Sequence, residues 1–473
     1  MKNTILILTF LFAGFLGMAQ TRERKVDSVC VLVKQYFNEK NAEKLYSLCG
    51  EKFKGQLSEQ VFTQLCQHNL FPIGEIERTI GESYVNGIGK YKVVCSSVNL
   101  TLLLSLDQTG KIETFLFQPY QEDAVKDFAV PTNNPLNSAL DKEVDSAVRT
   151  FMSLRNTVGL SLGILVGNRV YYYGYGETGR GNHHIPAPNT LFEIGSITKT
   201  FTATLLADAV DKRKLKLDDP LNKFLPDSIG PLEYDHVPIT LLTLANHTSG
   251  LPRMPDNIVL SAQTLKDPYS EYGDNQLFRF YKHFKTVRRP GASYDYSNLG
   301  MGTLGVALER VNHASFETLV VKTICNPLGM KDTRQSIRKP DSSRFAKGYD
   351  ANGEYAGPWN FKALAGAGAL RSTAADLLKY AKANLGKAPG WLNKDIQLTH
   401  YVTFNSSEAT VGLAWHYIHP GADTLLFHNG ETGGYFSYLA IDLDKRFAIV
   451  LLSNAAIDLD QVGNNLMVWL EKH

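Results

Sequence analysis

Residues 194–210 read IGSITKTFTATLLADAV and contain the pattern Ser-x-x-Lys at Ser196 and Lys199. Gly195 permits a sharp entry into a helix. The residues that follow keep an apolar stripe at helical spacing, formed by Ile197, Phe201, Leu205 and Ala209. On such a helix Ser196 and Lys199 are three positions apart and share one face.

This placement suits a nucleophile and its base. At the positive end of a helix, the backbone N–H of Ser196 can point at a developing oxyanion. Lys199, held near that end and away from water, loses proton affinity, and a neutral amine beside a hydroxyl can act as a base. A second Ser-x-x-Lys occurs at 336–339, where roughly two chance matches are expected in the whole chain. Pro340 follows it directly and disfavours helical geometry at Lys339, so we exclude that copy.

A Tyr-x-Asn pattern occurs at Tyr296 and Asn298. A phenol can pass a proton and an amide can hold a substrate carbonyl if a loop presents both inward. Taken alone, Tyr296 is more typical of a core aromatic residue. Another copy, Tyr84-Val85-Asn86, lies in the N-terminal region and is set aside.

His428-Asn429-Gly430 follows an apolar strand predicted over 424–427. Glycine at that place lets a substrate backbone approach a strand edge closely. The triplet His419-Pro420-Gly421 has the same spacing but is typical of a turn.

Two other chemistries are disfavoured by context. His416 and His419 have the spacing of a helical metal pair, but in a strand-like run they face opposite sides, and no third ligand is evident. The run 159–163, Gly-Leu-Ser-Leu-Gly, matches a nucleophile elbow, which requires a strand, a turn and a helix. It lies instead inside a predicted strand of a hairpin, so we interpret it as packing. We expect neither a metal nor a cofactor.

Together the three motifs resemble those of the serine beta-lactamase and penicillin-binding protein superfamily. The likeness is greatest to the branch that holds class C beta-lactamases, D-Ala-D-Ala carboxypeptidases and beta-lactamase-like esterases. Ser-x-x-Lys, Tyr-x-Asn and His/Lys-x-Gly occur in the family's order, about 100 and 130 residues apart, within residues 138–473. Three phrases agree with this: LANHTSGLP (244–252), PLGM (327–330) and GALRSTAAD (368–376).

The resemblance implies catalytic roles for three residues. Ser196 would be the acylated nucleophile, while Lys199 and Tyr296 would manage its proton and later help to activate water. Because Lys199 and Tyr296 would titrate as a coupled pair, neither is named as the single base.

The resemblance also implies which residues bind the substrate. Asn298 would hold the substrate amide, His428 and Gly430 would border the site, and the N–H groups of Glu431 and Ser196 would form the oxyanion hole. Class C beta-lactamases have lysine where His428 stands. A histidine is mostly neutral at pH 7 and lacks the fixed charge that suits the carboxylate of a beta-lactam. Peptidase, D-aminopeptidase or esterase activity is therefore favoured over efficient beta-lactamase activity.

The fold class is predicted as α+β, with a beta-lactamase/transpeptidase-like catalytic domain over 138–473 made of one antiparallel sheet flanked by helices, plus a helical subdomain. An amphipathic helix is expected over 138–155 and a closing helix near the C-terminus. Strands are expected at both ends of this domain, over 159–166, 169–175, 425–427, 435–442 and 447–452.

Residues 20–125 are predicted to form a small α+β accessory domain, followed by a polar linker over 126–137. Helices are expected over 25–70, then a strand run over 91–106, a turn at 107–110 and a further run over 111–117. This part is similar to the cone-shaped, nuclear-transport-factor-like domains that precede some of these hydrolases. It is interpreted as a docking or substrate-gathering module or, equally, as a structural cap.

Residues 1–19 have the features of a secretory signal peptide: Lys2, an apolar stretch over 5–16 and small residues before Gln20. The protein is therefore expected to be periplasmic or secreted, with no membrane span after cleavage. Export permits disulfides, and the pairing of the four early cysteines, or their presence as free thiols, is left open: Cys30, Cys49, Cys66 and Cys95.

Composition limits the partners. The chain is 44% hydrophobic and 20% charged, with 49 Lys+Arg against 47 Asp+Glu, a formal charge of +2. No basic stripe stands out, so nucleic acid is not expected as a partner. A small molecule or a peptide, including a cell-wall peptide, is the expected substrate; the oligomeric state is left open.

Three functions stay open at this point. The first is an exported serine hydrolase acting through an acyl-enzyme on peptide, amide or ester bonds. The second is a penicillin-recognising sensor that is acylated with little turnover, because deacylation depends on where water can sit. The third places the function in the N-terminal domain, as a binding site for a small apolar ligand.

Overall fold

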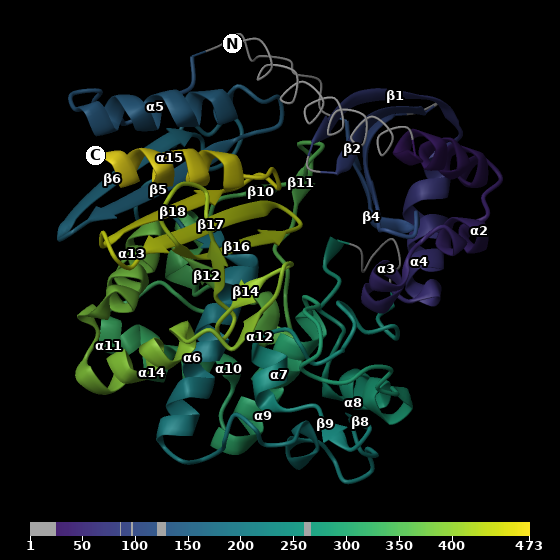
Figure 1. Ribbon diagram of the computed structural model, residues 1–473. Helices are drawn as coiled ribbons and strands as arrows, with labels where there is room; N and C mark the ends of the chain where they lie inside the picture. The colour runs from purple at the N-terminus through teal and green to yellow at the C-terminus, as the bar shows by residue number, and fades with distance from the viewer. Residues whose placement is uncertain (1–24, 86, 96–97, 121–128, 260–265) are drawn as a thin grey trace, which may run out of the picture. The chain divides into compact units, whose positions relative to one another are not determined.

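A computed structural model describes residues 25–85, 87–95, 98–120, 129–259 and 266–473 (Figure 1). The chain divides into two compact units, Met1–Glu122 and Asp123–His473, and each is described by itself. The predicted signal peptide lies outside the described residues. Within the described residues, no helix combines the length and apolar character that a membrane crossing requires.

The first unit is a small α+β structure, as predicted. A helix over 25–38 is followed by three short helices and then by a four-stranded antiparallel sheet in the order β1-β2-β3-β4. The bounds are α2 Ala42–Ser47, α3 Glu51–Gln56, α4 Glu59–Leu65, β1 Ile76–Val85, β2 Ile88–Cys95, β3 Asn99–Leu106 and β4 Ile112–Pro119. The expected strand run over 91–106 is wrong in one respect, because the chain reverses within it and forms two paired strands, β2 and β3.

Local chemistry explains where these elements begin and turn. The side chain of Asn41 accepts a hydrogen bond from Lys44 N at 2.9 Å and caps α2. At the predicted turn, Asp107 Oδ1 accepts from Thr109 N at 2.8 Å, and Gly110 adopts a φ of +82° that favours glycine. The β3–β4 hairpin therefore forms where the sequence predicts it.

The cysteines of this unit are core residues. Cys30, Cys49, Cys66 and Cys95 are all free and buried, as is Cys325 in the second unit. Burial raises the pKa of the thiols, to about 12 for Cys49 and Cys66. The protonated thiol is thus the stable form of these side chains.

The second unit is built on an eight-stranded antiparallel sheet with the order β13-β14-β15-β16-β17-β18-β5-β6. β18 pairs with β5, so strands from the two ends of the unit lie side by side in one sheet. The predicted α+β domain with one antiparallel sheet is confirmed. The bounds are β5 Gly159–Val166, β6 Arg169–Gly176, β13 Phe404–Asn405, β14 Thr410–Val411, β15 His416–Ile418, β16 Leu425–Thr432, β17 Tyr435–Asp442 and β18 Phe447–Ser453.

Three short strand pairs lie outside this sheet: β7 with β12, β8 with β9 and β10 with β11. Their bounds are β7 Phe192–Glu193, β12 Arg371–Ser372, β8 Glu233–Tyr234, β9 Val237–Pro238, β10 Gly348–Tyr349 and β11 Tyr355–Ala356.

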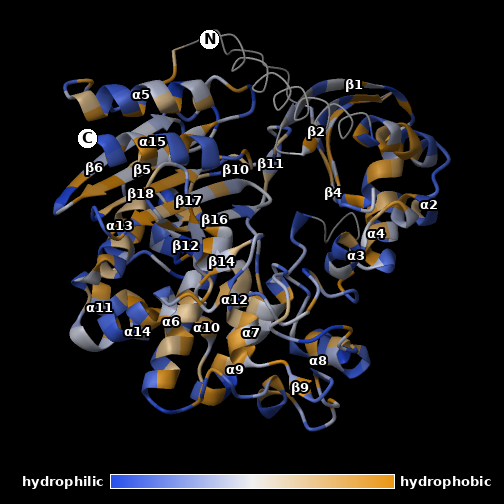
Figure 2. Ribbon diagram, in the orientation of Figure 1, coloured by the Kyte–Doolittle hydropathy of each residue, from blue (hydrophilic) through white to orange (hydrophobic). Residues whose placement is uncertain are grey.

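Helices cover both faces of the sheet (Figure 1). α5 and α15 pack on one face over an apolar cluster, and α5 shows the mixed hydrophilic and hydrophobic colouring of a surface helix in Figure 2. α13 packs on the other face, where the larger cluster joins the sheet to the helical part. The bounds are α5 Ala139–Met152, α6 Thr198–Asp211, α7 Leu241–Ala245, α8 Asp274–His283, α9 Asn298–Asn312, α10 Phe316–Val320, α11 Asn326–Leu328, α12 Ala365–Gly368, α13 Ala374–Lys382, α14 Gly390–His400 and α15 Asp460–Lys472.

The helix of the opening motif, α6, is more deeply buried than its apolar stripe indicates. The four stripe residues are buried as expected, and every residue from Thr198 to Ala209 is buried as well, so the helix is enclosed on all sides. Its threonines make this burial tolerable because their hydroxyls bond to backbone carbonyls; Thr202 Oγ1, for example, donates to Gly366 O at 2.7 Å.

The described part of the segment predicted as a linker, residues 129–137, belongs to the second unit and packs against its sheet and α5. Thr132 forms a bridge with Tyr175 of β6. Asn134 is buried, and its side chain donates to the Tyr175 hydroxyl at 2.6 Å and to Asp141 O at 2.7 Å. α5 follows this segment directly and begins with a capping box between Ser138 and Asp141.

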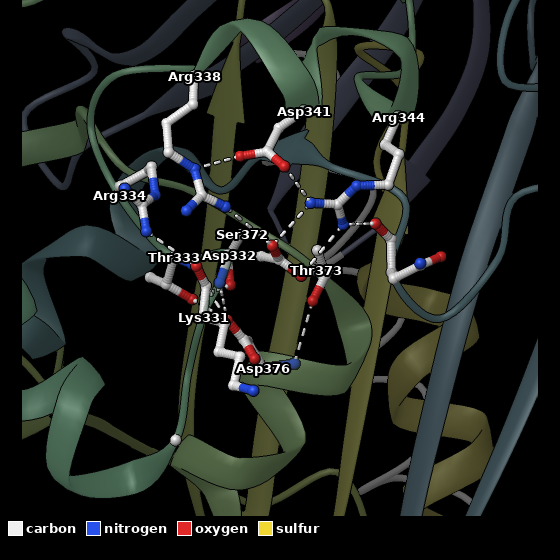
Figure 3. Close-up of polar contacts among 12 residues, drawn as sticks. Lys331, Asp332, Thr333, Arg334, Arg338, Asp341, Arg344, Ser372, Thr373 and Asp376 are labelled. Atoms are coloured by element: carbon white, nitrogen blue, oxygen red, sulfur yellow. Dashed lines mark hydrogen bonds and ion pairs between the residues drawn. The ribbon is translucent and has the colours of Figure 1, made fainter.

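An ion-pair network fixes the loop that contains the second Ser-x-x-Lys (Figure 3). Arg344 Nη2 donates to Asp332 and Asp341 at 2.7 Å each, and Arg338 pairs with Asp341. Asp376 of α13 accepts from Asp332 N at 2.8 Å. Lys339 begins a 3-10 helix in this loop, so the expectation of non-helical geometry there is wrong. Ser336 lies before that helix and donates to Glu317 at 2.8 Å.

Candidate active site

Ser196 is the point at which the buried motif segment reaches solvent. Of residues 191–209, it alone is not buried. It lies in a 3-10 turn, Gly195–Ile197, directly before α6. Gly195 has a φ of +45°, and a Cβ there would lie 2.8 Å from Glu431 N, so glycine is required for this close approach to β16.

Lys199 lies beneath the serine. Its Nζ is 2.9 Å from Ser196 Oγ and 2.7 Å from Ala367 O, and the side chain is 0% exposed. Burial, and then the charge of Arg253, hold the pKa of Lys199 well below its ordinary value. The environment therefore favours the uncharged amine, which can accept the serine proton.

Tyr296 completes the polar group around the nucleophile. Its phenol is close enough to Ser196 for the serine to lower its pKa, and its ring centroid is 4.8 Å from Lys199 Nζ. Burial raises the pKa of Tyr296 to about 12, while the charge of Arg253 and the proximity of Ser196 oppose this rise. The structure thus brings together Ser196, Lys199 and Tyr296, from sequence positions 100 residues apart.

Asn298 is placed by the start of α9. The helix is capped by the Ser297 side chain, which accepts from Gly300 N at 2.8 Å. Asn298 Nδ2 makes only long contacts, 3.5 Å to the Tyr269 hydroxyl and 3.8 Å to Met254 Sδ. Both contacts are weak, so the amide can exchange them for a substrate carbonyl.

The third motif lies inside a strand rather than after one. The strand expected over 424–427 continues to Thr432 as β16, because residues 428–432 pair along β17. β15 pairs with β16 only through Phe427, so among the described strands none covers the outer edge of β16 beyond that point. This edge carries His428, Gly430 and Glu431.

Gly430 sets how closely β16 lies to the nucleophile. A Cβ at this position would be 2.1 Å from Ile194 O and 2.7 Å from Ser196 N. The N–H of Ser196 and the N–H of Glu431 are thereby held in one small region, which has the donor set of an oxyanion hole.

His428 is a buried, uncharged imidazole. It is 2% exposed, and its Nδ1 donates to the Asn429 carbonyl at 2.6 Å, which leaves Nε2 as a bare acceptor. Among the described residues Nε2 has no hydrogen-bond partner. Burial holds the pKa of His428 well below its ordinary value, so the position lacks a positive charge at neutral pH.

Two further histidines belong to the site; sequence analysis named His416 only as half of a disfavoured metal pair and did not single out His247. His247 stacks on Tyr296 with ring centroids 4.4 Å apart, and its Nδ1 accepts from Ser297 N at 3.1 Å. His416 bonds through Nε2 to the Tyr294 hydroxyl at 2.6 Å, and its ring centroid is 5.2 Å from that of His428. The phrase LANHTSGLP contains His247 and was the available signal for it.

The other sequence candidates lie elsewhere. Ser161 is buried in β5 and donates to Ala187 O, and Tyr84 belongs to the first unit. His416 and His419 are not brought together: His416 faces the site, whereas His419 is exposed beside Thr424. In the described part of the chain, no cluster of three metal-ligating side chains is present.

The comparisons with known proteins agree with this geometry. The family model described as Beta-lactamase matches residues 144–468. A beta-lactamase of Pseudomonas fluorescens is 30% identical over 345 residues, which cover 66% of this chain and 92% of that protein. A D-alanyl-D-alanine-carboxypeptidase/endopeptidase, AmpH, of Escherichia coli is 28% identical and covers 63% of this chain and 80% of its own length.

Solved structures give the same result. A D-alanine carboxypeptidase, AmpC, from Burkholderia cenocepacia superposes with a TM-score of 0.60 at 26% identity, covering 69% of this chain and 98% of that one. A class C beta-lactamase superposes with a TM-score of 0.62 at 27% identity, covering 71% of this chain and 97% of that one. The match of the family model over most of the second unit shows that this chain belongs to the Beta-lactamase family, as a serine hydrolase of the beta-lactamase-related superfamily.

Proposed function

We propose that this protein is an exported serine hydrolase that cleaves peptide, amide or ester bonds through an acyl-enzyme on Ser196. The observation that carries the proposal is the contact of Ser196 Oγ with a buried amine, Lys199 Nζ, at 2.9 Å, together with the Tyr296 phenol. Similarity to beta-lactamases and to D-alanyl-D-alanine carboxypeptidases supports the reaction class. The features of residues 1–19 support export to the periplasm or the medium.

In this mechanism Ser196 Oγ attacks the substrate carbonyl carbon and its proton passes to the Lys199–Tyr296 pair. The N–H groups of Ser196 and Glu431 stabilise the oxyanion, and Asn298 holds the substrate amide. The bond to the leaving amine or alcohol then breaks, and the pair returns the proton to that group. Water, deprotonated by the same pair, hydrolyses the ester and restores Ser196.

The neutral state of His428 supports a preference among substrates. A beta-lactam presents a carboxylate, and an uncharged, buried imidazole offers it no permanent charge at that position. We therefore favour a D,D-peptidase, D-aminopeptidase or esterase over an efficient beta-lactamase.

Labelling with a fluorescent penicillin and a fluorophosphonate, followed by intact mass, tests the proposal. The wild type should gain one label and Ser196→Ala none, while Ser336→Ala, in the second Ser-x-x-Lys, should label as the wild type does. A folded wild type that neither probe labels would contradict the proposal. The decay of the penicilloyl label separates a hydrolase from a sensor, because a sensor would show a burst without steady turnover.

A further inference from the structure

A buried histidine that the mechanism does not use packs against the second motif. His247 is 0% exposed and lies in the loop that follows α7. Its ring stacks on that of Tyr296, with centroids 4.4 Å apart and planes inclined by 29°. Two rings this close and this nearly parallel restrict each other's rotation, because each occupies the space into which the other would turn.

Hydrogen bonds join His247 to the residues on both sides of Tyr296. Its carbonyl accepts from Asp295 N at 2.7 Å, and its Nδ1 accepts from Ser297 N at 3.1 Å. The residue before the tyrosine and the residue after it are thus bound to the same histidine that stacks on the ring. These three contacts set the position of the Tyr296 backbone and side chain together.

The contact through Nδ1 requires an uncharged imidazole. In the neutral ring one nitrogen carries the proton, and because Nδ1 of His247 accepts, the proton is on Nε2. A second proton on Nδ1 would face the Ser297 N–H and end this hydrogen bond. Burial is the main cause that holds the pKa of His247 well below its ordinary value, so the accepting form is the stable one at neutral pH.

The loop that carries this histidine is braced on two sides. The carbonyl of Thr248 accepts from Gly291 N at 2.7 Å, and the carbonyl of Ala245 accepts from Ala414 N at 2.8 Å. Gly291 belongs to the segment before the second motif, whereas Ala414 lies shortly before β15. The imidazole therefore has a fixed support, against which the tyrosine ring is held.

We propose that His247 is a positioning residue of this hydrolase, which holds the Tyr296 phenol in its place beside Ser196. The inference rests on the proposed function and deepens it, since it concerns the same acyl-enzyme site. In this role His247 acts through the tyrosine and not on the substrate. Without it the phenol would take up other orientations, and a misplacement of about 1 Å can cost on the order of 100-fold in rate.

The test measures whether His247 acts through the tyrosine hydroxyl. Labelling of Ser196 by a fluorophosphonate, followed by intact mass, gives the acylation rate with a probe that has no amide for Asn298 to hold. His247→Ala should lower this rate about 10- to 100-fold. In a Tyr296→Phe background the same substitution should change the rate by less than about threefold, because the hydroxyl that needs orientation is absent.

Two milder substitutions separate the two side-chain contacts. His247→Asn keeps an acceptor for Ser297 N, because the amide oxygen can take the place of Nδ1, and loses the ring. His247→Phe keeps the stacked ring and loses the acceptor. Each variant retains one contact, so each should be labelled faster than His247→Ala and more slowly than the wild type.

His400→Ala is the matched control. His400 is also an uncharged histidine inside the second unit, since burial lowers its pKa to about 4. Its Nε2 bonds with Asn384 Oδ1 at 2.8 Å, and its ring centroid is 6.3 Å from that of Trp415. Neither contact involves a residue of the three motifs, so labelling should stay within about threefold of the wild type. Urea unfolding of every variant shows that the labelled protein is folded.

Two results would overturn the inference and leave the proposed function standing. If His247→Ala lowered the rate equally with and without the Tyr296 hydroxyl, His247 would support the site as a whole rather than the phenol. If His247→Ala were labelled at the wild-type rate, the tyrosine would keep its place unaided. If the folded wild type is never labelled at Ser196, the proposed function fails and the inference fails with it.

Discussion

Lys199 and Tyr296 divide proton transfer between a buried amine and a partly buried phenol. Burial lowers the pKa of an amine and raises that of a phenol, because in each case it penalises the charged form. The pKa of Lys199 lies well below its ordinary value and that of Tyr296 lies at about 12. Burial thus favours the uncharged form of both groups, and Ser196 can pass its proton to the amine.

The acylation rate should accordingly be flat over the alkaline range. The labelling rate of Ser196 by a fluorophosphonate should already be constant with pH well below the ordinary titration range of a lysine, because burial favours the neutral amine and the phenol still carries its proton. As the pH falls through the pKa of Lys199, the ammonium ion forms and the rate should fall. Stopped-flow labelling across pH measures this profile.

Tyr296→Phe provides the control, since it should lower the rate and keep the flat region. A rate that rises about tenfold per pH unit between about pH 8 and about pH 10 would contradict the assignment. That profile would mean that the tyrosinate, present in a small and growing fraction, removes the serine proton.

At the scale of elements, the site depends on how closely β16 lies to the turn before α6. Gly195 and Gly430 face each other across this contact, and a side chain at either position would collide with backbone atoms. The contact brings the N–H groups of Ser196 and Glu431 into one region. A shift of β16 by the size of one methyl group would separate them.

Gly430→Ala should therefore abolish function with less effect on folding. Its Cβ would lie 2.1 Å from Ile194 O, so β16 must move, and we expect acylation to fall by roughly 100-fold or more, as for the loss of an oxyanion donor. Gly357→Ala is the matched control, because no atom lies within 4 Å of its added Cβ. Labelling rates and urea unfolding of both variants measure the effect; an unimpaired Gly430→Ala would show that β16 does not form the oxyanion hole.

Elements with a local signal could be predicted from the sequence, and contacts across the chain could not. The β5–β6 hairpin follows from the Gly167-Asn168 turn, and Gly167 does adopt a φ of +59°. The stacking of His247 on Tyr296 joins two loops, and Arg253 lies over the same ring from a third place in the sequence. No regular spacing along the sequence predicts either contact, because the conformations of the loops decide which side chains meet.

The burial of α6 on all sides was missed for another reason. Threonine is a polar residue in the sequence, but here the threonine hydroxyls bond to buried carbonyls.

At the scale of the whole molecule, the chain has separate hydrophobic cores. The core of the first unit consists only of residues from Val26 to Phe117, whereas the clusters of the second unit begin at Val130. Each unit also has its own complete sheet. Separate cores predict separate cooperative unfolding, since a cavity made in one core removes no contacts from the other.

Paired core substitutions in the full-length chain test this independence. Leu102 and Leu451 are both 0% exposed, one in each unit, and Leu→Ala at such sites costs about 2–5 kcal/mol. In calorimetry Leu102→Ala should lower one transition by on the order of 10 °C, and Leu451→Ala should lower only the other, by less for the same free energy because the second unit is larger. Ser196 labelling at room temperature should be unchanged in Leu102→Ala. If both substitutions moved a single shared transition, the two units would fold as one body, and the first unit would then be a structural part of the hydrolase rather than a separate module.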